Sequence, residues 1–126
     1  MDNRRQKLGQ WGENLAKMEL LGKGYVLLAQ NWRCSRGEVD LIVQDGETMV
    51  FVEVKTRRGR DLGTPEDAIT AHKARKLYTI AQTYLAEQES GDIPWRIDLV
   101  AVELDKQGQL LRCEHRENIL AFGFVY

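Results

Sequence analysis

Residues 37–57 read GEVDLIVQDGETMVFVEVKTR, and this stretch decides the fold. Apolar and polar residues alternate over 38–43, and 48–55 is rich in β-forming residues, so each segment predicts a strand. Asp45 and Gly46 lie between them, and both residue types tolerate the positive φ of a two-residue hairpin turn. The sequence therefore predicts an antiparallel β-hairpin.

The hairpin turn also predicts which side chains share a face of the sheet. A turn at these two residues places Asp40 opposite Phe51 and Glu38 opposite Glu53. Lys55 lies two residues beyond Glu53 and points to the same face. Asp40 and Glu53 become diagonal neighbours, about 7–8 Å apart at Cα, which allows two carboxylates to share one metal ion.

The same charges have a plain structural interpretation. A hairpin often carries charges on a solvated face, where Lys55 would neutralise Glu53. Against this, Glu38, Asp40 and Glu53 would be three like charges in mutual reach, which is destabilising unless a cation neutralises them. Spacing alone leaves both interpretations open.

The rest of the chain supplies helices and strands around this hairpin. Apolar residues at helical spacing over 4–21 predict an amphipathic helix with the stripe Leu8, Trp11, Leu15 and Met18. Further elements are expected as a strand at 25–32, a helix from 65 to about 89, a strand at 97–104 and a short edge strand at 109–115. A helix between strands favours a parallel crossover. This order predicts an α/β fold with a central mixed β-sheet flanked by helices.

Composition bounds the class of protein. The 126 residues are 43% hydrophobic and 29% charged, which suits a single domain spanning 1–126. The net charge of -1 argues against binding nucleic acid by bulk positive charge, although local basic patches can still do so. No CxxC pair and no apolar run of about 18 residues occurs, so we expect reduced cysteines, no membrane span and a cytoplasmic location.

Specific motifs extend the interpretation over nearly the whole chain. The strings GxxGE, NWR, GEVDLI and FVEVKTR resemble the YraN-like family of bacterial proteins, relatives of archaeal Holliday-junction resolvases. Asp40, followed after twelve residues by Glu53-x-Lys55, resembles the PD-(D/E)xK nuclease signature. The element order resembles the restriction-endonuclease-like αβββαβ core. Val39 stands where the superfamily motif has proline.

The resemblance implies a metal-dependent nuclease site. Asp40 and Glu53 would be the main ligands of Mg²⁺ or Mn²⁺, with the Val54 carbonyl as an additional ligand, and Lys55 would lie beside the attacking water. Magnesium prefers carboxylate oxygens, and it lowers the pKa of a bound water. Glu13 matches the helical glutamate that resolvase-like members add to the metal site, whereas helical geometry alone would leave it exposed to solvent.

Other charges surround this site. Glu38 lies on its face without a superfamily counterpart, and would tune Lys55 or pair with Arg36. Lys73 interrupts an apolar helical stripe, where most lysines extend their charge to solvent. Four cations are candidates for contacts with a nucleic-acid backbone, and solubility is the alternative role for the first three: Arg57, Arg58, Arg60 and Lys73.

Together these features predict a magnesium-dependent endonuclease for DNA, or less favourably RNA, acting on branched or damaged structures. The alternative is a nucleic-acid-binding or adaptor module on the same fold that turns nothing over. A resolvase would need a homodimer to cut two strands symmetrically, and the alternating apolar residues of 119–126 are the only hint of one. His72 and His115 have no partner at ligand spacing.

Overall fold

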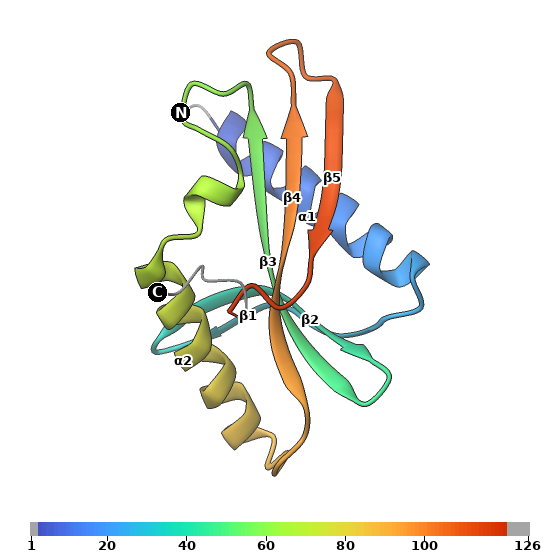
Figure 1. The fold of residues 1–126 in the computed structure, drawn as a ribbon, viewed down its shortest axis with the longest axis vertical. Helices are drawn as coiled ribbons and strands as arrows, with labels where there is room; N and C mark the ends of the chain where they lie inside the picture. Colours follow the sequence, from blue (N-terminus) through green and yellow to red (C-terminus); the bar gives the residue numbers. More distant parts are fainter. Residues whose placement is uncertain (1–2, 121–126) are drawn as a thin grey trace.

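The computed structural model describes residues 3–120, which form one five-stranded sheet between two helices (Figure 1). The elements are α1 (Arg4–Gly22), β1 (Val26–Cys34), β2 (Gly37–Asp45), β3 (Thr48–Arg58), the 3₁₀ helix η1 (Glu66–Ala68), α2 (Ala71–Glu87), β4 (Trp95–Leu104) and β5 (Leu110–Arg116). The strands lie in the order β1-β2-β3-β4-β5. Only β3 and β4 pair in parallel, as a crossover through α2 requires. The predicted α/β fold is confirmed, and it is consistent with a restriction-endonuclease-like core.

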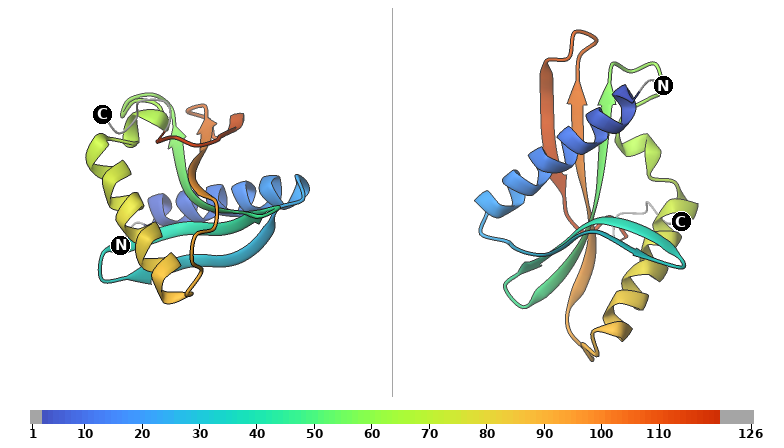
Figure 2. Two further views of the ribbon diagram at one scale, coloured as in Figure 1. Left: turned by 60° about the horizontal axis from the view of Figure 1, so that its bottom comes forward. Right: turned by 180° about the vertical axis from the view of Figure 1, so that it is seen from behind.

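The two helices cover opposite faces of the sheet (Figure 2). Phe51 and Ile97 belong to the apolar core under α2, while Val52 and Val100 belong to the core under α1. Strands β3 and β4 are therefore buried on both faces, which is typical of a parallel pair. Neither helix in residues 3–120 has the length and apolar character needed to cross a membrane.

Helix α1 is rotated relative to the predicted apolar stripe, of which Leu8 and Leu15 still pack against the core under the helix. Its buried residues follow at four-residue intervals: Gly12, Ala16 and Leu20. Trp11 and Met18 of the stripe are 42% and 69% exposed. Small residues face the sheet because the helix lies very close to β3: a Cβ at Gly12 would fall 1.9 Å from Thr56 Oγ1. Glu13 thereby lies on the flank of the buried face.

The hairpin register differs from the prediction by two residues. Ile42 faces Phe51, the position expected for Asp40. The turn begins one residue later, and its first central residue, Gly46, takes a φ of 60°. A register shift by an even number of residues changes the cross-strand partner of a residue but not the face of the sheet on which it lies. Asp40 and Glu53 therefore remain on the same face, as predicted.

The sheet opens beside the second half of β3. The pairing of β2 with β3 extends only to Leu41, whereas β3 continues along β4 to Arg58. Val39 packs into the core under α2 although Leu41 packs under α1. Residues two apart in a regular strand share a face, so β2 twists at Asp40. Among the described residues, no strand covers the edge of β3 over 53–58. Figure 1 shows β1 and β2 turning away there.

The predicted second helix is interrupted. Pro65 precedes the short helix η1, and α2 begins only after Thr70, whose side chain accepts a hydrogen bond from the Lys73 backbone N–H at 3.1 Å. This N-cap satisfies one of the first unpaired N–H groups of the helix. Lys73 consequently lies in the first turn of α2. Residues 121–126 of the predicted apolar tail are outside the described residues.

Candidate metal centre and its groove

The predicted carboxylates Asp40 and Glu53 meet where β2 leaves β3. Asp40 Oδ2 accepts a hydrogen bond from the Val54 backbone N–H at 2.7 Å, which replaces the backbone partner that β2 no longer supplies. The Glu53 side chain is only 3% exposed. Burial, then the charge of Glu53 and a hydrogen bond with it, raises the pKa of Asp40 to about 8. A half-buried carboxylate next to a buried one favours a shared proton or a bound cation.

Two lysines from different elements neutralise Glu53. Lys73 Nζ of α2 lies 3.0 Å from Glu53 Oε2, and Lys55 Nζ of β3 lies 3.4 Å from the same oxygen. Both lysine side chains are 28% exposed, so solvent or a ligand can reach them. Lys73 is therefore part of the site rather than a side chain that extends to solvent from a core stripe.

Glu13 of helix α1 is linked to this region by a hydrogen bond from Asn31. The sequence did not predict Asn31 as a site residue. With its amide nitrogen turned toward the two carboxylates, Asn31 donates to Glu13 Oε1 at 2.9 Å and to Glu38 Oε1 at 3.0 Å. Asn31 adopts a φ of 51°, a conformation that asparagine tolerates and that recurs at functional sites. Burial, then the charge of Glu38, raises the pKa of Glu13. Glu38 pairs with Arg33 at 2.9 Å, and not with Arg36 as predicted.

The oxygen ligands suit a small, hard cation at one position. Within residues 3–120, no three His, Cys, Asp or Glu side chains gather closely enough to hold one metal ion. The carboxylates instead form two pairs, Asp40 with Glu53 and Glu13 with Glu38. One or two carboxylates are enough for magnesium when water and phosphate complete its ligands. Asp40 and Glu53, with the Val54 carbonyl, fit this requirement, and Glu13 would need a local rearrangement to join them.

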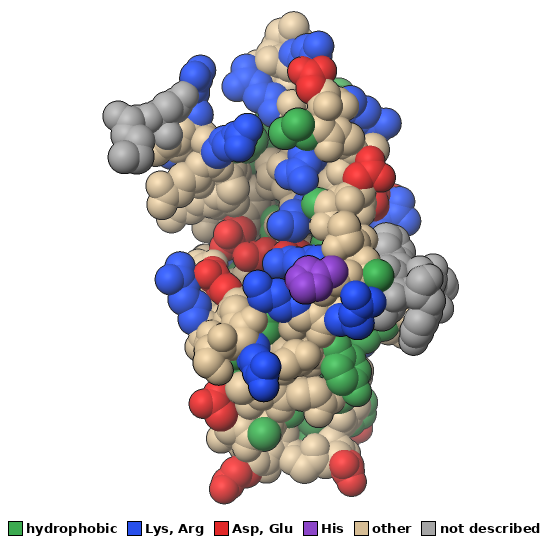
Figure 3. Space-filling view, turned by 90° about the vertical axis from the view of Figure 1, so that its left-hand side faces the viewer, with side chains coloured by type: hydrophobic (Ala, Val, Ile, Leu, Met, Phe, Trp, Pro, Cys, Tyr) green, Lys and Arg blue, Asp and Glu red, His purple; other side chains and the backbone are tan. Residues whose placement is uncertain are grey.

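A groove of about 710 Å³ follows the open edge of β3 from Glu13 to Leu62. Helix α1 forms one wall, and β3 with the loop after it forms the other. The cations that line it are Arg5, Lys55, Arg57 and Arg58. Arg60 lies outside this lining and pairs with Glu103 at 2.5 and 3.0 Å. On the face shown in Figure 3, Lys and Arg side chains surround a recess that holds acidic ones.

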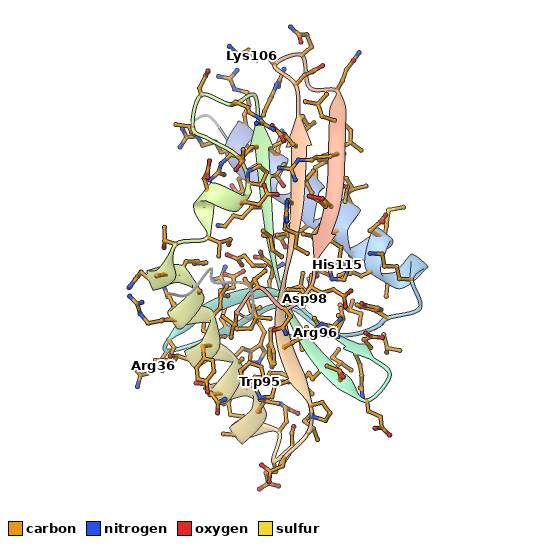
Figure 4. The ribbon with its side chains drawn as sticks, in the orientation of Figure 1. Arg36, Trp95, Arg96, Asp98, Lys106 and His115 are labelled. Carbon is orange, nitrogen blue, oxygen red and sulfur yellow. The ribbon has the colours of Figure 1, made fainter. Side chains whose placement is uncertain are left out.

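Strand β4 carries two more buried carboxylates, away from the predicted site. Asp98 binds Arg96 at 3.0 Å and His115 at 2.7 Å, and Figure 4 shows these three residues beside one another. Glu103, which is 2% exposed, binds Arg112 at 2.9 Å in addition to Arg60 of the loop after β3. His115 has no partner at ligand spacing in the sequence, because its partner Asp98 comes from a neighbouring strand.

The fold and the acidic pair place the chain in a class of α/β proteins consistent with a restriction-endonuclease-like core. The chain belongs to the Uncharacterised protein family UPF0102, whose model matches residues 12–102, and this confirms the predicted YraN-like resemblance. A UPF0102 protein of Symbiobacterium thermophilum is 48% identical over 113 residues, covering 90% of this chain and 95% of its own. Those of Roseiflexus castenholzii and Geotalea uraniireducens are 42% and 41% identical over 116 and 121 residues, covering 91% and 96% of this chain and 94% and 93% of their own.

Proposed function

We propose that this protein is a metal-dependent phosphodiesterase that acts on nucleic acid. The pair formed by Asp40 and Glu53 carries the proposal, because holding a half-buried carboxylate against a buried one is unfavourable unless a proton or a cation joins them. Val54 and Lys55, which follow Glu53 in β3, line a groove with several cationic side chains, where a polyanion would bind. A divalent cation bound there lowers the pKa of its water and stabilises charge on a phosphate.

The residues of the chain have separable roles in this proposal. The Val54 N–H fixes the Asp40 carboxylate, and the strand fixes Glu53, so the two oxygen ligands are positioned in advance. Lys55 would orient the attacking water, and Lys73 would contact a phosphate oxygen once Glu53 has another cation. Further along the groove, Arg57 and Arg58 would bind phosphates without reading sequence.

The alternative is a nucleic-acid-binding or adaptor module without turnover. One observation favours it: two lysines already contact Glu53, so this carboxylate has cationic partners without a metal ion. The groove would still bind a polyanion through its arginines. The two functions therefore differ in their metal dependence and share the binding surface.

Cleavage of a substrate panel with Mn²⁺ or Mg²⁺ separates them. The panel contains duplex, single-stranded, flapped and four-way-junction DNA, together with RNA. We expect Asp40→Ala and Glu53→Ala to abolish cleavage. Glu103→Gln is the control, because it alters a buried carboxylate on the adjacent strand and should retain activity per folded molecule. No cleavage of any substrate, with binding that survives both alanine substitutions, would support the binding module instead.

A further inference from the structure

Two hollows adjoin on helix α1, one on each side of Glu13. The groove of about 710 Å³ lies on one side, and a second hollow of about 420 Å³ lies on the other. Arg5, Gly9 and Glu13 line both hollows. Because these residues are four apart, they lie on one flank of the helix and span about 12 Å along it. Together the hollows form a path that passes Glu13 and Glu38, and also Val54 and Lys55, which follow Glu53 in β3.

The lining of this path suits a strand of nucleic acid. Arg57 and Arg58 lie in the groove and Arg33 lies in the second hollow, so cations flank the carboxylates on both sides. The second hollow also contains four neutral amide side chains: Gln6, Gln10, Gln30 and Asn31. Amides both donate and accept hydrogen bonds, so they can bind sugars and bases without adding charge.

Two polar atoms in the wall of the groove have no hydrogen-bond partner among the described residues. These are Thr56 Oγ1 and Arg57 Nε, and both are buried. The Arg57 guanidinium contacts the Thr56 carbonyl through Nη1 at 3.3 Å, so it lies along the uncovered edge of β3. Buried polar atoms of this kind are rare in folded proteins and point to a missing partner. A phosphate or sugar oxygen in the groove would supply one for Arg57, whereas Thr56 Oγ1 lies against Gly12 of α1.

The size and the apolar lining of the path suit an unstacked strand. Each hollow lies within the range of about 300–1,000 Å³ that encloses a drug-sized molecule. Leu8 and Leu62 line opposite walls, and Leu62 is 73% exposed, so each wall offers an apolar surface to an unstacked base.

We propose that a single strand of nucleic acid runs along this path, and that the substrates are nucleic acids with an unpaired segment at the site. Flaps, frayed ends and gaps have such a segment, whereas an intact blunt duplex does not. The proposal deepens the proposed function, on which it rests for the position of the scissile phosphate. Binding of the strand itself requires neither metal nor cleavage.

Gly9 allows the path to be blocked without removing a charge. A Cβ on Gly9 would meet no atom of the described residues within 4 Å, so Gly9→Leu should fold and should favour the helix. Its side chain would enter the junction of the two hollows. Gly22 ends the same helix and is equally open, so Gly22→Leu is the matched control.

Affinity is measured by fluorescence anisotropy in EDTA, with oligo(dT), a flapped duplex and the same duplex with blunt ends as probes. Wild type and Gly22→Leu should bind oligo(dT) and the flap at least about tenfold more tightly than the blunt duplex, and Gly9→Leu should lose this preference. Equal affinity of wild type for all three probes, no binding, or an unchanged preference in a folded Gly9→Leu would overturn the proposal. Absence of cleavage would count against the phosphodiesterase and leave these affinities unaffected.

Discussion

Two ionic clusters on the same sheet differ in what their carboxylates meet. In the cluster beside β5, Arg112 pairs with Glu66 at 2.6 Å and with Glu103 at 2.9 Å. The hydrogen bond from Arg112 lowers the pKa of Glu66 to about 2, and that from Arg60 lowers the pKa of Glu103. At the candidate site, burial and a neighbouring carboxylate raise the pKa of Asp40 to about 8. The first cluster is electrostatically complete, whereas the second would be stabilised by an added cation.

The cations of the two clusters also differ in kind. Glu66 and Glu103 form ion pairs with arginines, whose planar guanidinium groups bind carboxylates in a fixed, often bidentate geometry. Glu53 forms ion pairs with lysines. A lysine carries a point charge on a flexible stem, so it can exchange one partner for another. One cluster is therefore suited to holding strands and loops together, and the other to changing partners when a ligand arrives.

Glu103→Gln should produce the largest loss of stability, because it leaves Arg60 and Arg112 without their shared carboxylate. We expect the free energy of unfolding to fall by about 2 kcal/mol, since a charged hydrogen-bond partner is removed from a buried position. Urea denaturation measures the loss. Glu114→Gln is the control, because this exposed partner of Arg112 should cost less than about 1 kcal/mol. Equal losses in the two variants would remove the distinction between buried and exposed members of the cluster.

In contrast to Glu103→Gln, Asp40→Asn should stabilise the metal-free protein at alkaline pH. The folded protein keeps the Asp40 proton up to about pH 8, while the unfolded chain releases it near its ordinary value of 3.8. The contribution of Asp40 to stability is therefore complete below about pH 4 and is lost as the pH rises through 8. Asparagine does not ionise and can still accept the Val54 N–H.

We expect Asp40→Asn to exceed wild type by at least about 1.4 kcal/mol at pH 8.5 and to match it at pH 4. Urea denaturation in EDTA at both pH values measures the difference. Asp98→Asn is the matched control: it alters a buried aspartate that binds Arg96 and His115, and it should destabilise the protein. An Asp40→Asn variant less stable than wild type at pH 8.5 would show that the carboxylate pair is not strained.

The sequence predicted the acidic pair because strand periodicity and the hairpin turn depend only on residues close together in the chain. Alternation with period two and the turn at Gly46 define a hairpin, and they bring Asp40 and Glu53 to one place whichever even register the turn selects. The Glu-x-Lys spacing then places Lys55 beside Glu53. Helix, hairpin and crossover followed in the predicted order for the same reason, since each element carries its own periodicity and end signals.

The missed features depend on contacts between distant segments. Helix α1 turns Gly12 to the sheet because Thr56 leaves no room for a larger residue, and no helical stripe reveals that contact. Asn31 acquires its role from a left-handed backbone conformation between two carboxylates. Its place in the NWR string was the one available signal. His115 finds Asp98 across strands, where no spacing rule applies.

Manganese should stabilise the site cluster and leave the arginine cluster unaffected. At ten times its dissociation constant, a cation that binds only the folded state adds about 1.4 kcal/mol to the free energy of unfolding. Binding must displace the proton of Asp40, so the affinity should fall between pH 8 and pH 5. Thermal denaturation with and without Mn²⁺ measures the effect. It should persist in Glu103→Gln and vanish in Glu53→Gln, and equal shifts in both variants would place the cation elsewhere.

The smallest expected effect distinguishes Arg58, at the end of β3, from Arg60 in the loop that follows. Arg58 lines the groove and donates its Nε to the Lys106 carbonyl, whereas Arg60 pairs with Glu103. If Arg58 contacts a phosphate, Arg58→Ala should weaken binding of a single-stranded oligonucleotide a few-fold. It should also reduce the slope of log affinity against log salt by about 0.7, the value for one phosphate on a single strand.

Arg60→Ala should leave the salt slope unchanged and lower stability instead, because its partner is a buried carboxylate rather than a nucleic acid. Anisotropy titrations between 50 and 200 mM salt, paired with urea denaturation, measure both quantities. Since the two substitutions remove the same chemical group two residues apart, bulk charge cannot explain a difference between them. A reduced slope in Arg60→Ala would return this residue to the nucleic-acid contacts that the sequence predicted, and would show that its ion pair opens when a polyanion binds.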